Sequence, residues 1–270
     1  MPIAVQSFGS GSSGNALLVE SSETLILIDC GLAPRSLAAA LAASGRSLGD
    51  LDAVLLTHEH VDHMRALSGL ARAGVTVVCT AGTARSAAVA SERWEEIRPA
   101  TELRLGDLAI EALPVSHDAA EPCGFTLSAD GVRVTVATDL GRADAALHGV
   151  VAVSDLVVLE ANHDEEMLRR GPYPARTKRR VLSDLGHLSN DASGALLAAS
   201  FVGTRRLPTV WLAHLSQTNN RPELARQAVA RALAARDQVA PILPLPRREV
   251  GPVWRSNGQP VTPIQLAMGL

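Results

Sequence analysis

Residues 58–63 read His58-Glu59-His60-Val61-Asp62-His63 and place four potential metal ligands within six positions. The apolar run Ala53–Leu56 comes directly before them. A strand that ends there delivers the ligands onto a loop at its carboxyl end, where alternating side chains converge on one point. Imidazole and carboxylate ligands together suit zinc, manganese or iron. The stretch therefore predicts a metal site, because a chance cluster of polar loop residues rarely has this pattern.

The composition is that of a globular protein. The chain has 270 residues, of which 47 % are hydrophobic and 20 % charged, and we expect a single domain over residues 1–270. The segment Met1–Ser7 lacks the pattern of a signal peptide, and apolar stretches such as Ala195–Val202 are too short to span a bilayer. The three cysteines are widely spread, which favours a reducing cytoplasm over a disulfide framework.

Strand and helix patterns alternate in two similar halves. The strand runs are Ile3–Phe8, Ala16–Glu20, Leu25–Ile28, Ala53–Thr57, Thr76–Cys79, several between Glu102 and Ala137, Asp155–Glu160 and Thr209–Ala213. The helical runs are Pro34–Ser44, Met64–Ala73, Thr83–Ala90, stretches up to about residue 202, and Leu224–Ala235 after a capping-box spacing of Asn220 and Glu223. A proline-rich tail follows. Mixed strands bounded by helices, occurring twice, predict two sheets packed face to face with helices outside.

Further candidate ligands follow other strands. His117 comes after Ile110–Ser116, Asp139 comes after Val132–Thr138, and His214 comes after the run that ends at Ala213. A lone histidine at the end of a strand is more often structural than a ligand. Three such residues in series after the 58–63 stretch instead favour one shared site.

This assembly resembles the metallo-β-lactamase superfamily over nearly the whole chain. The resemblance implies an α/β fold, a four-layer αβ/βα sandwich of two mixed β-sheets with the site along one edge. It also implies two divalent metal ions, manganese or zinc, that polarise the bond under attack. The residues it implies as ligands are His58, His60 and His117 for one ion, Asp62, His63 and His214 for the other, and Asp139 between them. Asp29 would orient a ligand histidine or the loop, unless it only forms a turn.

Four further motifs indicate which branch of the superfamily the chain resembles. They are Ser10–Asn15, Leu159–Asp164, Gly186–Asn190 and Ala213–Asn220. Together they resemble the YycJ/WalJ family of exonucleases, which is linked with 5′-to-3′ degradation of DNA. By similarity to RNase Z, Glu160 would orient His187, which would stabilise the scissile phosphate or protonate the leaving oxygen.

Several of these residues have alternative roles. His187 could instead cap the helix that begins near Asn190, and His163 could contact substrate or cap the following helix. The loop that carries Ser12, Ser13 and Asn15 could present N–H groups to a 5′ phosphate, or form an ordinary turn.

One dense basic stretch lies between His163 and His187. It contains Arg169, Arg170, Arg176, Lys178, Arg179 and Arg180. The net charge is −3, so DNA binding needs such a local patch, and we expect Arg176, Lys178 and Arg179 to contact the backbone. A solvated helical face is the alternative. Aromatic residues make up only 3 %, which favours a duplex held by its phosphates over a single strand held by its bases.

Two departures from the resemblance bear on function. Met64-Arg65-Ala66 follows the ligand loop where the superfamily usually has a glycine, and the chain lacks the long arm with which RNase Z holds tRNA. We therefore expect a cytoplasmic, metal-dependent phosphodiesterase that acts on DNA as a 5′-to-3′ exonuclease in repair, with Asp62, Glu160 and His187 as catalytic residues. The alternatives are a small-molecule hydrolase (a cyclic phosphodiesterase or a glyoxalase II-like thioesterase) and a metal-stabilised DNA-binding or regulatory protein without turnover.

Overall fold

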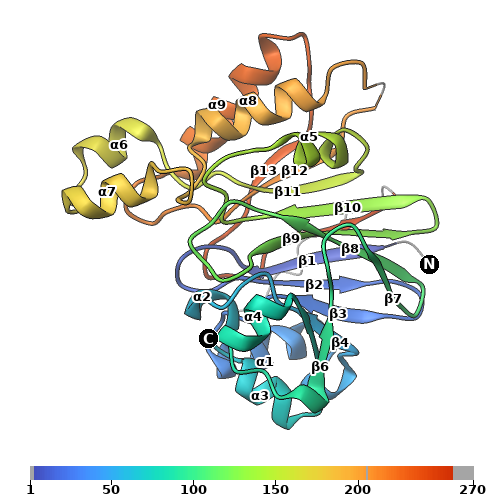
Figure 1. The fold of residues 1–270 in the computed structure, drawn as a ribbon. Helices are drawn as coiled ribbons and strands as arrows, with labels where there is room; N and C mark the ends of the chain where they lie inside the picture. Colours follow the sequence, from blue (N-terminus) through green and yellow to red (C-terminus); the bar gives the residue numbers. More distant parts are fainter. Residues whose placement is uncertain (1–2, 205, 258–270) are drawn as a thin grey trace, which may run out of the picture.

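The strands form two seven-stranded sheets in the computed structural model, which describes residues 3–204 and 206–257 (Figure 1). The first sheet has the order β14 (Val253–Arg255), β1 (Ala4–Gly9), β2 (Ala16–Glu20), β3 (Leu25–Ile28), β4 (Ala53–Leu55), β5 (Thr76–Cys79) and β6 (Trp94–Glu96). The second has the order β13 (Ile242–Pro244), β12 (Thr209–Ala213), β11 (Leu156–Glu160), β10 (Val132–Ala137), β9 (Cys123–Ala129), β8 (Leu108–Pro114) and β7 (Glu102–Leu105).

Each sheet changes from antiparallel to parallel pairing along its width. In the first sheet, β3 to β6 are parallel, and in the second, β10 to β13 are parallel. The turns at Gly106-Asp107 and Asp130-Gly131 join antiparallel pairs of strands. Because parallel strands run the same way, their carboxyl ends share one edge of the sheet. The loops after β3, β4, β10, β11 and β12 therefore open on the edges that carry the candidate ligands.

Apolar side chains fill the space between the sheets. Ile26, Phe125 and Trp211 belong to this central cluster. The outer face of the first sheet packs against α1 (Pro34–Ala43), α3 (Leu67–Arg72) and α4 (Ala81–Ser86). The outer face of the second packs against α5 (Ala145–Ala152), α8 (Asn190–Ser200) and α9 (Pro222–Ala234). The predicted class, two mixed sheets with helices outside, is confirmed.

A small arm projects from the body between β11 and α8 (Figure 1). It consists of α6 (Glu165–Arg170) and α7 (Ala175–Val181), which carry the basic stretch. The remaining helical segments are the short α2 (Val61–Met64) and 3₁₀ turns at Leu48–Asp50 and Ser91–Arg93. No helix in the described ranges has the length and apolar character needed to cross a bilayer.

The helix predicted over Met64–Ala73 is broken in the structure into α2 and α3. The N–H of Ala66 donates to the carbonyl of Cys30, and the carbonyl of Asp62 accepts from the N–H of Asn15. These long-range bonds replace the helical bonds that would continue α2, so the chain bends at Ala66. The helix predicted over Thr83–Ala90 begins earlier, at Ala81, because the Thr80 hydroxyl caps it.

The predicted capping box at Asn220 and Glu223 is wrong. Helix α9 begins at Pro222, and its N-cap residue Arg221 makes no side-chain capping bond. The Asn220 amide instead donates to the carbonyls of Ala161 and Asn162. The predicted tail forms β13 and β14, and residues 258–270 lie outside the described part. The expectation of one domain over residues 1–270 therefore stays a prediction.

We expect Phe125→Ala to lower the free energy of unfolding by about 3–5 kcal/mol. The ring is fully buried between the sheets, so its removal leaves a cavity that both sheets line. Urea denaturation of the metal-free protein measures the change. Val239→Ala is the control, since Val239 is 88 % exposed, and a similar loss in both variants would contradict the assigned core.

Candidate metal centre

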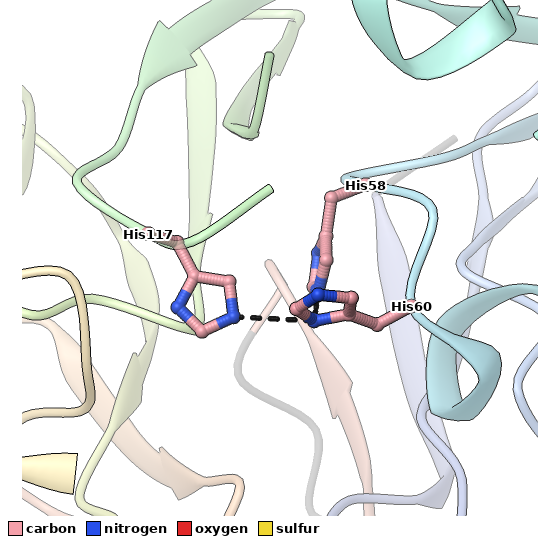
Figure 2. Close-up of side chains that lie close together, drawn as sticks. All are labelled: His58, His60 and His117. Carbon is pink, nitrogen blue, oxygen red and sulfur yellow. Dashed lines mark hydrogen bonds between the residues drawn. The ribbon is translucent and has the colours of Figure 1, made fainter. Parts of the chain in front are cut away.

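Two sets of candidate ligands meet at the shared edge of the sheets. The nitrogens of His58, His60 and His117 form one set, whose ligand atoms all lie within 4.8 Å of one another. Figure 2 shows His117 facing His58 and His60 from the opposite side. His60 Nδ1 lies 3.1 Å from His58 Nε2 and 3.3 Å from His117 Nε2. The three rings thus point ligand nitrogens at one small volume.

The second set consists of Asp62, His63 and His214. Asp139 adjoins both sets, because its carboxylate groups with His58 and His63 under the same distance limit. Asp139 Oδ2 lies 3.1 Å from His63 Nε2. The structure therefore brings together all seven residues that the sequence offers as metal ligands.

The chemistry of these groups fits bound cations. Burial and the neighbouring charge of His63 hold the pKa of His58 well below its usual value, so its ring is neutral and has a free lone pair. His214 Nε2 is buried without a hydrogen-bond partner among the described residues. A buried nitrogen of this kind is costly unless a ligand satisfies it, and divalent metal ions prefer such mixed imidazole and carboxylate sites.

Buried acceptors bind the ring nitrogens of His63 and His117 that point away from the centre. Asp29 Oδ2 accepts a bond of 2.7 Å from His63 Nδ1, while Asp29 Oδ1 accepts the N–H and hydroxyl of Thr57. His117 Nδ1 donates to the carbonyl of Gly186 at 3.1 Å. Bonds of this type fix the tautomer of a ligand and aim its other nitrogen at the metal. Sequence reasoning missed the role of Thr57, which has no motif signal of its own.

Glu160 is the most connected of these carboxylates. Its Oε1 accepts from His187 Nδ1 at 2.8 Å and from His214 Nδ1 at 2.9 Å. Its Oε2 accepts the N–H groups of Leu140 and Leu188. Burial opposes the charge, but the neighbouring His187 ring and the hydrogen bonds from His187 and His214 more than offset it and lower the pKa of Glu160 to about 2. The sequence predicts its link to His187 but gives no sign of its link to His214.

The backbone bends sharply where three of these side chains enter the site. Asp29, Asp139 and His214 have φ angles of 61°, 58° and 52°. This left-handed region costs a residue with a side chain roughly 1–2 kcal/mol. Glycine would avoid that cost but would supply no functional group. At Gly31, by contrast, a Cβ would come within 1.6 Å of the Asp62 carbonyl, so only glycine lets the ligand loop lie there.

The candidate substrate-binding residues lie in different surroundings. Ser12 is exposed and Ser13 half-buried on the 10–15 loop. Asn15 is buried, and its side chain accepts the Gly11 N–H and donates to the Asp62 carbonyl. Asn15 therefore shapes the loop and joins it to the ligand stretch.

Neither His163 nor His187 caps a helix. His163 is 1 % exposed, and the caps of α6 and α8 are Asp164 and Ser189, so the helix-cap alternatives for His163 and His187 are wrong. Arg176 and Arg179 are exposed on α7, and Lys178 Nζ donates to the Arg169 carbonyl.

Comparison with known proteins places the chain in a family. Residues 24–210 match the family model described as the beta-lactamase superfamily domain. The chain belongs to the β-lactamase superfamily. Exodeoxyribonuclease WalJ of Streptococcus pneumoniae is 37 % identical over 236 residues, covering 84 % of this chain and 87 % of WalJ. Exodeoxyribonuclease YycJ of Bacillus anthracis is 36 % identical over 230 residues, covering 83 % and 86 %.

A solved structure shares the fold. The metallo-β-lactamase fold protein YhfI from Bacillus subtilis aligns with a TM-score of 0.72 at 17 % identity, covering 94 % of this chain and all of YhfI (100 %). The β-lactamase superfamily and the WalJ/YycJ family predicted from the motifs are confirmed. Together, the family and the His/Asp clusters indicate that the protein binds divalent metal.

We expect Glu160→Gln to weaken binding of Mn²⁺ or Zn²⁺ about 10–100-fold. An amide has one oxygen, so it cannot accept both pairs of N–H donors that the two carboxylate oxygens hold. Competition with a chromogenic chelator measures the affinity. The exposed Glu102→Gln serves as the matched control, and equal affinity in both variants would refute the role of Glu160.

Metal binding should strengthen as the pH rises. Burial opposes a charge on His63, but the carboxylates of Asp29 and Asp139 more than offset this and raise its pKa to about 10. Below that pH the metal-free ring is protonated on both nitrogens, and an ion that binds Nε2 must displace one proton. Burial also opposes a charge on His214, but the charge of Asp139 and the bonds to Asp62 and Glu160 more than offset this and raise its pKa well above the usual value. The apparent affinity should therefore rise about 10–100-fold per pH unit from about pH 6 to 9, as one or both rings lose a proton. A flat profile in chelator competition would contradict this assignment.

Proposed function

We propose that the protein is a metal-dependent nuclease that degrades DNA, acting as a 5′-to-3′ exonuclease in repair. Its curated relatives are named exodeoxyribonucleases and match most of the chain. The observation that carries the proposal is that a full cluster of candidate ligands lies beside His187. The Nδ1 atom of His187 is bonded to Glu160 and lies 3.5 Å from Asp139 Oδ1. Such a histidine suits phosphodiester cleavage, where a leaving oxygen needs a proton.

The proposed cofactors are two divalent ions, Mn²⁺ or Zn²⁺. His58, His60 and His117 would hold one, Asp62, His63 and His214 the other, and Asp139 would contact both. Such ions, when bound, polarise the phosphodiester and neutralise its developing charge. The Asp62 side chain is 23 % exposed, so of the two aspartates among these ligands it faces the entering substrate more than Asp139 does, at 3 %.

His187 is the proposed general acid. Its Nδ1 is held by Glu160, and its side chain is 11 % exposed, so Nε2 is the nitrogen available to substrate. From there His187 would stabilise the scissile phosphate or give a proton to the leaving 3′ oxygen. Help of this kind contributes about 10²–10⁴-fold to a rate.

The proposed substrate is duplex DNA with a 5′ phosphate. Ser12 and Ser13 lie on a loop joined through Asn15 to the carbonyl of Asp62, so a phosphate bound there is close to the ligand stretch. Arg176, Lys178 and Arg179 on α7 would neutralise backbone phosphates farther along the duplex. A cytoplasmic location is part of the proposal, since Cys30, Cys79 and Cys123 are free and buried.

Linear duplex DNA with a 5′ phosphate, labelled at either end, tests the proposal directly. With Mn²⁺ or Zn²⁺ we expect mononucleotides to be released from the 5′ end first. His60→Ala should abolish the reaction because it removes a ligand from the first set, while the core between the sheets stays intact.

Two results would count against the proposal. Release from the 3′ end would reverse the polarity. Turnover of a generic phosphodiester or thioester with no digestion of DNA would favour a small-molecule hydrolase of the same fold. Circular dichroism of His60→Ala, compared with wild type, separates loss of chemistry from loss of structure.

A further inference from the structure

One cation of the arm reaches the rim of the metal centre. Arg180, near the end of α7, forms a two-pronged ion pair with Asp118, with Nε 2.5 Å from Oδ2 and Nη2 2.7 Å from Oδ1. Asp118 directly follows the candidate ligand His117, and its Oδ1 lies 3.4 Å from His117 Nε2. The guanidinium is therefore separated from the ligand set by a single carboxylate.

Other cations of the arm are engaged within the arm itself. Arg169 pairs with Glu165 and Arg170 with Glu166, one helical turn away in each case. The hydrogen bond to Asp118 is the main cause that raises the pKa of Arg180, and the charges of Asp139 and Asp62 also contribute. Its guanidinium thus lies within electrostatic reach of the carboxylates at the centre.

Hydrogen bonds tie the chain just after Arg180 to the loop that carries His117. The Ser116 hydroxyl donates to the Asp184 carbonyl at 2.8 Å, and His117 Nδ1 donates to the Gly186 carbonyl at 3.1 Å. These bonds fasten the chain after α7 to the loop that carries His117. A side chain in such a place is oriented before any substrate arrives, which lowers the entropy lost on binding.

The ion pair of Arg180 and Asp118 is exposed enough for a phosphate to reach the guanidinium. The side chains of Arg180 and Asp118 are 47 % and 34 % exposed, and a pair this exposed adds little to the stability of a protein. A phosphate can therefore share the guanidinium at little cost to the fold. Without Arg180, Asp118 would present an uncompensated negative charge where DNA phosphates must enter.

We propose that Arg180 binds the phosphate next to the scissile one, and that Asp118 orients its guanidinium for that contact. The neighbouring phosphate is the fitting partner because Asp118 lies between Arg180 and His117. The planar, two-pronged guanidinium matches phosphate oxygens better than a lysine ammonium does. This proposal rests on the nuclease function and names a residue that positions its substrate.

Steady-state kinetics of Arg180→Ala and Arg180→Lys on 5′-phosphorylated DNA provide the first test. We expect Arg180→Ala to raise KM about 10–100-fold, with kcat changed far less and the metal content as in wild type. Arg180→Lys should recover part of the loss. Arg98→Ala is the matched control, because Arg98 forms a similar two-pronged, exposed pair with Glu96 elsewhere on the surface.

Neutral methylphosphonate linkages, placed one at a time, locate the contact. The linkage next to the scissile bond should slow wild type but cause little further loss in Arg180→Ala. Equal sensitivity of both proteins at every linkage would overturn the proposal, as would an Arg180→Ala variant that digests DNA like wild type. So would loss of metal from that variant, since it would show that the pair only supports the His117 loop.

A single-phosphate ester separates this proposal from the function on which it rests. If wild type cleaves bis(p-nitrophenyl) phosphate but never digests DNA, the nuclease function fails, and the Arg180 contact fails with it. If wild type digests DNA, Arg180→Ala should lower kcat/KM for DNA relative to kcat/KM for that ester. An unchanged ratio would refute Arg180 alone and leave the nuclease function standing.

Discussion

The buried carboxylate of Glu160 connects most parts of this site. It lies at the end of β11 and holds His214 from the end of β12, His187 from the segment after the arm, and the N–H of Leu140. A buried charge is tolerated only when its acceptor positions are filled, and the four bonds to Glu160 come from three separate segments of the chain. The relative positions of the candidate ligand His214 and of His187, the proposed general acid, therefore depend on one side chain.

Negative charge is the second constraint on this edge of the fold. Asp29, Asp62, Asp139 and Glu160 gather where four strands end, and Asp118 adds a carboxylate at the rim. A polyanionic substrate is repelled unless cations compensate these groups. Divalent ions suit the inner carboxylates, and Arg180 compensates Asp118 outside them. Cations at the inner carboxylates and Arg180 at Asp118 would together let a chain with a net charge of −3 bind the proposed DNA substrate.

Most of the fold and the candidate ligand set could be predicted from the sequence because both depend on local patterns. Apolar strands followed by His or Asp can be read residue by residue, and parallel pairing takes these ends to one edge. The break at Ala66 could not be read this way, because it depends on a bond to Cys30. The Arg180–Asp118 pair joins residues 62 positions apart, and Asn15 turns inward to Asp62 across 47 positions. In neither pair does a sequence motif of one residue predict its contact with the other.

The arm bears on both the proposed general acid and the proposed DNA-binding surface. Helices α6 and α7 have only six and seven residues, lengths at which a helix depends on contacts with the rest of the protein. Leu168 and Val181 are their buried residues, so little apolar packing holds the outer part. The inner end is instead fixed by polar bonds at Asp118, Ser116 and His117. Because His187 follows directly, the bonds that hold the arm in place also set the position of this proposed general acid. The proposed substrate contacts and the proposed proton transfer therefore depend on the same bonds.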